Sequence, residues 1–74
     1  MYFYIKTNKR FFLRLNAGHP LVREGLVDMN YSTDLINWNV LSSVNNIEIS
    51  PLRTVYFKGF NMNGLDGSNR LQVD

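Results

Sequence analysis

The chain contains no cysteine, so disulfide bonds cannot compensate for its small size. A domain of 74 residues buries only about 60% of the surface exposed by its unfolded chain, and such domains usually gain stability from disulfides, metals or partners. A metal site would depend on the single histidine, His19, plus carboxylates, which is an unusual ligand set for zinc. We therefore expect no metal and no cofactor. We expect association with copies of the chain or with a larger protein.

Membrane and secretion signals are also missing. No run approaches the roughly 20 apolar residues of a membrane span, and the first residues lack the basic region, long apolar run and small-residue cleavage site of a signal peptide. We expect no membrane contact, and we expect the chain to be made in a cytoplasm and to work there or in something assembled there.

No catalytic motif is present. The sequence has no Walker loop, dinucleotide fingerprint, HExxH or GxSxG. Asp28 and Asp34 are better explained as a strand residue and a turn residue than as a catalytic pair. The stretch from Asn16 to Gly25 contains glycine and proline and is expected to be a loop that bridges two sheets. His19, beside Pro20 in this stretch, is expected to be an ordinary loop residue. The prediction is a protein that is not an enzyme.

Aromatic and turn-forming residues are abundant, whereas alanine occurs once. Ten asparagines favour turns, and β-branched and aromatic residues favour strands. Asn63-Gly64 and Asp66-Gly67 are both strong turn signals. Alternating or β-rich runs predict seven short strands, at 2–6, 10–15, 26–31, 37–40, 46–50, 54–58 and 70–73. The predicted fold is all-β: one domain over residues 1–74, a small antiparallel β-sandwich or barrel. The first two runs are expected to form a hairpin, and the runs at 26–31 and 37–40 a second one.

The alternation separates a core from an outer face. The predicted core residues are Tyr31, Trp38, Ile47, Ile49, Val55 and Phe57. Net charge is +2, and it is uneven: residues 1–25 contain five basic residues and one acidic residue, and the remainder three basic and five acidic residues. This asymmetry is compatible with head-to-tail association or an acidic partner.

A resemblance to a known type of module rests on three segments. They are Tyr31-Ser32-Thr33-Asp34 with Trp38, then Ile47-Glu48-Ile49, then Thr54-Val55-Tyr56-Phe57-Lys58-Gly59 with Asn61. Together they resemble small β-sandwich modules of bacteriophage structural proteins and bacterial surface proteins, over about half of the chain (residues 27–64). Such modules usually have glycine or serine in the turn, where this chain has Leu35-Ile36-Asn37. The resemblance implies a building or adhesion unit with no shared active site.

The leading hypothesis is a non-enzymatic bacteriophage virion protein, a capsid-associated decoration, lining or fibre-attachment subunit. Its partners would be other virion proteins, such as the major capsid protein or fibre, or copies of itself. The free edge of the first strand is a candidate for β-strand addition by a partner. The expected interface residues are Phe3, Arg10, Phe12, Arg14, Leu35 and Ile36.

Two alternatives remain open. The first is an adhesion or glycan-binding module of a bacterial surface protein, with a site formed by Trp38, Tyr31 and the Asn-rich loop 59–69. The second is a single-stranded nucleic-acid binder, because residues 6–14 combine basic side chains with Phe11 and Phe12.

Overall fold

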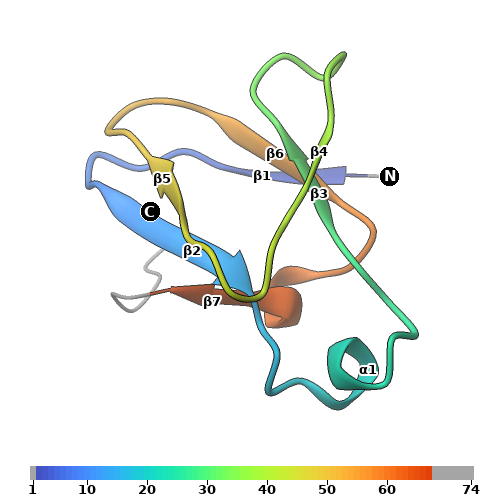
Figure 1. Cartoon of the computed structure of the whole chain (residues 1–74). Helices are drawn as coiled ribbons and strands as arrows, with labels where there is room; N and C mark the ends of the chain where they lie inside the picture. Colours follow the sequence, from blue (N-terminus) through green and yellow to red (C-terminus); the bar gives the residue numbers. More distant parts are fainter. Residues whose placement is uncertain (1, 68–74) are drawn as a thin grey trace.

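The computed structural model describes residues 2–67 of the chain. These residues form seven short strands, a four-residue helix and a 3-10 turn (Figure 1). The strands are β1 (Tyr2–Ile5), β2 (Phe11–Leu15), β3 (Asn30–Ser32), β4 (Asn39–Val40), β5 (Ile47–Ile49), β6 (Val55–Lys58) and β7 (Leu65–Gly67). The helix α1 (Pro20–Arg23) precedes β3, and the 3-10 turn (Met62–Gly64) precedes β7. The predicted all-β class, a small antiparallel sandwich or barrel, is confirmed.

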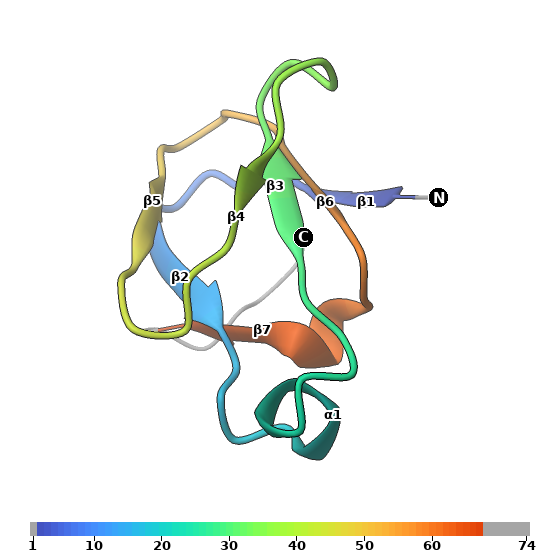
Figure 2. The same cartoon turned by 45° about the vertical axis from the view of Figure 1, so that its right-hand side comes forward.

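The strands form two antiparallel sheets around one interior (Figures 1 and 2). The four-stranded sheet has the order β1-β6-β3-β4, and the three-stranded sheet has the order β5-β2-β7. Buried apolar side chains from both sheets and from two connecting segments form the core: Ile5, Phe11, Leu13, Leu15, Met29, Leu41, Ile49, Val55, Phe57 and Leu65. Each large side chain buried in this way contributes about 1.5–3 kcal/mol.

The alternation in β2 shows how the sequence specifies these faces. Phe11, Leu13 and Leu15 are buried, whereas Arg14 is exposed, as a period of two requires. β6 behaves in the same way, with Val55 and Phe57 buried.

The expected hairpin between the first two strands is wrong. β1 pairs with β6, in a register that runs from Tyr2 opposite Lys58 to Ile5 opposite Val55. β2 pairs with β5 and β7 in the other sheet. The buried Thr7 explains the corner, because its Oγ1 accepts from the Lys9 amide at 2.9 Å and its carbonyl accepts from the Leu52 amide at 2.7 Å. The chain therefore leaves one sheet and enters the other.

The predicted C-terminal turns are also partly wrong. Asp66-Gly67 was expected in a turn, but both residues belong to β7, which pairs with β2. The Arg14 guanidinium donates to Asp66 Oδ2 at 3.1 Å and supports this pairing. The expected strand at 70–73 lies outside the described residues.

The stretch from Asn16 to Gly25 was expected to be a loop that bridges two sheets. It does connect β2 to β3, in different sheets, and it contains α1. His19 is the N-cap of that helix, and its Nδ1 accepts from the Leu21 amide at 3.2 Å. In the described part of the chain, no helix is long and apolar enough to cross a membrane.

Candidate contact surface

β1 is the edge strand of the four-stranded sheet, and only β6 pairs with it among the described residues. In an antiparallel pair, alternate residues of an edge strand direct their backbone N–H and C=O groups away from the sheet. β1 thus has unpaired hydrogen-bonding groups along one side. These groups are a template for a further strand.

The two faces of β1 carry different aromatic side chains. Phe3 is half-buried and stacks on Phe57, with ring centroids 5.3 Å apart and planes at 20°. Tyr2 and Tyr4 are 52% and 61% exposed on the opposite face. Tyr56 of β6 contacts both tyrosines, with centroids 5.5 Å from Tyr2 and 6.2 Å from Tyr4. We call the three tyrosines, Tyr2, Tyr4 and Tyr56, the tyrosine face.

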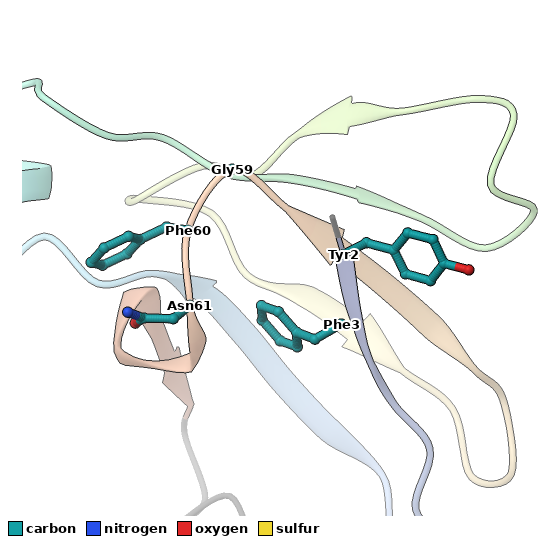
Figure 3. A pocket seen from close by; sticks show the side chains of 5 residues that line it. All are labelled: Tyr2, Phe3, Gly59, Phe60 and Asn61. Carbon is teal, nitrogen blue, oxygen red and sulfur yellow. The ribbon is translucent and has the colours of Figure 1, made fainter.

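A hollow lies on each face of β1. The first has a volume of about 440 Å³ and is lined by Tyr2, Phe3, Gly59, Phe60 and Asn61 (Figure 3). In this view Phe3 points toward the segment that holds Asn61, and Tyr2 points the other way. We call it the Phe3 hollow.

The second hollow lies over the tyrosine face. Its volume is about 450 Å³, and it is lined by Tyr2, Tyr4, Lys6, Thr54 and Tyr56. Both volumes fall in the range of ligand pockets, roughly 300–1,000 Å³. Because Tyr2 lines both hollows, the edge of β1 is flanked by concave surface on its two sides.

Gly59 shapes the Phe3 hollow. Its φ of +108° disfavours any side chain, and a Cβ built there would lie 2.5 Å from the Asp28 carbonyl oxygen. The bend at Gly59 leads into Phe60, which packs against the core and against His19, with ring centroids 5.0 Å apart. The Asn61 side chain then accepts from the Asn63 amide at 2.9 Å and starts the 3-10 turn.

Positive charge accompanies the tyrosine face. Lys6 lines the second hollow, and Lys58 Nζ lies 4.1 Å from the centroid of the Trp38 ring. Neither lysine forms an ion pair with the residues that the structure describes. The two ion pairs seen there are on the other sheet, between Arg10 and Glu48 and between Arg14 and Asp66.

The predicted interface residues lie in three separate places. Arg10, Phe12 and Arg14 lie together on the outer side of β2, where the Arg10 guanidinium is 5.5 Å from the Phe12 ring centroid. Phe3 is on the inner face of β1. Leu35 and Ile36 are exposed in the turn between β3 and β4. The structure therefore brings three of these residues together and leaves the others apart.

Most predicted core residues occupy the interior. Ile49, Val55 and Phe57 are buried, and Tyr31 and Ile47 are half-buried against the core.

The core prediction for Trp38 needs correction. Trp38 is half-buried and contacts Lys58, and it is not among the described residues that form or pack on the core. The cause is the strand alternation, which places it on the same side as the exposed Val40. The hairpin itself, with β3 paired to β4, is as expected.

The turn after Tyr31 is held by Asp34. Its Oδ1 accepts from the amides of Ile36 at 2.9 Å and Asn37 at 2.8 Å, and from the Ser32 hydroxyl at 2.9 Å. Its Oδ2 accepts from the Asn37 side chain at 2.8 Å. These bonds, the Asn37 amide foremost, hold the pKa of the Asp34 carboxyl far below its usual range. The Ser-Thr-Asp motif therefore builds a turn.

The residue sets of the two alternative functions are not assembled as expected. Tyr31 packs toward the core while Trp38 lies on the other side of the sheet, so they do not line a common glycan site. In the basic stretch, Phe11 is buried. Among residues 2–67 there is no cluster of three metal-ligating side chains.

Sequence reasoning missed the tyrosine face as a unit. The alternation of Tyr2 and Tyr4 was visible in the sequence, but the third member comes from β6. Only the long-range pairing of Tyr4 with Tyr56 brings it there.

Comparison with known proteins gave no match: no family model, no curated protein and no solved structure is significantly similar to the chain.

Proposed function

We propose that this protein is a non-enzymatic structural subunit that acts by protein–protein contact, with the edge of β1 as its principal contact. The observation that carries the proposal is the unpaired side of β1 together with the exposed aromatic surface around it. Large exposed aromatic side chains are enriched in protein interfaces. A small domain without disulfides also gains stability from a partner.

The setting we propose is a bacteriophage particle, in which the chain is a capsid-associated decoration, lining or fibre-attachment subunit. The resemblance of residues 27–64 to phage structural modules supports this setting. The Asp34-centred turn lies within these residues and holds the β3–β4 hairpin through several hydrogen bonds.

Purified particles of the virus that encodes the chain provide the test. Mass spectrometry should detect the chain in particles purified by density gradient, and a lysine-reactive cross-linker should join Lys6 or Lys58 to a capsid or fibre protein. Tyr4→Glu should reduce incorporation into particles, because a charged side chain on an edge strand opposes strand addition. Val40→Glu, on the exposed opposite edge of the same sheet, is the matched control and should be incorporated normally.

Absence of the chain from purified particles would refute the virion setting. Equal incorporation of the two glutamate variants would refute β1 as the contact.

A further inference from the structure

Building on the proposed function, we infer that the partner of β1 is an extended segment of another protein chain in which apolar and acidic side chains alternate. The segment adds to the four-stranded sheet beside β1. It places an apolar side chain in the Phe3 hollow, and its acidic side chains lie beside Lys6.

The first step of the argument is the strand edge. Strand addition uses main-chain hydrogen bonds for affinity and pockets for alternate side chains for specificity. β1 has the unpaired edge, and it has a hollow on each of its two faces. A strand laid beside β1 would present successive side chains to these two faces in turn.

The second step is the chemistry of the inner face. The Phe3 hollow contains two aromatic rings, Phe3 and Phe60, and the bare backbone at Gly59. Its rings are fixed, because Phe3 stacks on Phe57 and Phe60 packs between the core and His19. A preformed apolar hollow of this kind accepts an aromatic or branched aliphatic side chain.

The third step is the chemistry of the outer face. Lys6 lines the hollow over the tyrosine face, and Lys58 lies on the same face beside Trp38. No carboxylate of residues 2–67 forms an ion pair with either lysine. Charge complementarity therefore favours acidic side chains on this side of the incoming strand, with the tyrosine rings packed against their stems.

NMR titration of the ¹⁵N-labelled protein with eight-residue peptides tests the inference. The probe panel alternates glutamate with leucine, valine or phenylalanine. Three matched panels replace glutamate by lysine, replace the apolar residues by alanine, or scramble the alternation. Amide hydrogen exchange reports whether the unpaired amides of β1 become protected when the peptide binds. A general gain in protein stability would slow exchange in all strands, whereas strand addition slows it mainly in β1.

We expect the alternating acidic panel to shift and protect the amides of β1, and the alanine panel to bind at least about tenfold more weakly. Lys6→Glu should weaken binding of the acidic panel about fivefold and favour the lysine panel instead. Lys9→Glu makes the same charge change in the exposed segment between β1 and β2, away from both hollows. It should leave the preference for acidic peptides unchanged.

The remaining outcomes overturn the inference in distinguishable ways. Binding that ignores charge or alternation, or binding away from β1, refutes the stated partner chemistry. If no peptide binds and the free protein is a dimer whose β1 amides are protected, the occupant is a second copy, and the proposed contact function survives. If no peptide binds, the protein is monomeric and cross-linking in particles also fails, both proposals fall.

Discussion

Replacing Gly59 with alanine should destabilise the protein far more than the same change at Gly25. Both glycines have positive φ, +108° at Gly59 and +73° at Gly25. They differ in their surroundings: an added Cβ at Gly25 would meet nothing within 4 Å, whereas at Gly59 it would lie 2.5 Å from the Asp28 carbonyl oxygen. The pair therefore separates the cost of the backbone conformation from the cost of a close backbone approach.

The expected magnitudes follow from these two terms. A left-handed backbone costs an alanine about 1–2 kcal/mol, and this is the whole effect expected at Gly25. At Gly59 the contact forces β6 and the segment before β3 apart, and overpacking of this kind adds about 1–3 kcal/mol. In a domain of this size, 1 kcal/mol corresponds to about 4–8 °C in Tm. A total loss of 2–5 kcal/mol is a large part of the stability of a small domain.

Urea unfolding followed by circular dichroism measures both variants against the unsubstituted chain. Equal losses of unfolding free energy, or a larger loss at Gly25, would refute the argument that the approach of Gly59 to Asp28 shapes this region. Because Gly59 and Phe60 line the Phe3 hollow, the Gly59 variant should also shift the amide resonances of the start of β1, whereas the Gly25 variant should not.

Two further predictions concern the turn between β3 and β4. Leu35 has a φ of +64°, so Leu35→Gly should raise the free energy of unfolding by about 1 kcal/mol in urea denaturation; an unchanged or lower value would contradict the strain. Asp34 has a pKa lowered by folding from its ordinary value of 3.8, so its stabilisation is complete above about pH 5 and is lost as pH falls toward the folded pKa. The urea concentration at the unfolding midpoint should therefore fall between pH 4 and pH 2. It should fall more steeply than in Asp34→Asn, whose amide oxygen still accepts from the turn amides. Equal pH dependence of the midpoint in the two proteins would contradict the role of the Asp34 carboxylate.

The alternation of apolar and polar residues was enough to predict the fold class and most inward-facing side chains. In β2 and β6 every second residue is apolar, and these residues are buried as expected. The period of two fixes which side chains share a face, and this information is local. The sequence therefore identified Ile49, Val55 and Phe57 as interior residues.

Strand partners were harder to predict because they depend on distant residues. A compact turn between two β-rich runs suggested a hairpin, but the buried Thr7 turns the chain into the other sheet. Arg10 and Arg14, predicted as interface residues, are instead paired with Glu48 and Asp66 in the three-stranded sheet. The tyrosine face depends on the pairing of β1 with β6, and no local pattern contains that pairing.

Trp38 illustrates a different limit. A large aromatic residue in a hairpin is a reasonable candidate for the core, and the alternation correctly placed it on one side with Val40. The alternation does not show which face of the sheet is turned to the interior. In the structure Tyr31, on the opposite face from Trp38, makes the apolar contact with the core. Lys58, from β6 on the other side of β3, then lies over the indole ring.

The pairing of β1 with β6 also constrains the order of folding during synthesis. Of the described strands, β1 leaves the ribosome first, and its partner β6 is one of the last to emerge. The four-stranded sheet therefore cannot close on a nascent chain that lacks β6, and Tyr2, Phe3 and Tyr4 remain unpaired until then. Proteins dominated by such distant contacts fold in roughly milliseconds to seconds. Until β6 emerges both edges of β1 are open, so a partner strand that meets the nascent chain cannot distinguish the edge that stays free from the edge that β6 will occupy.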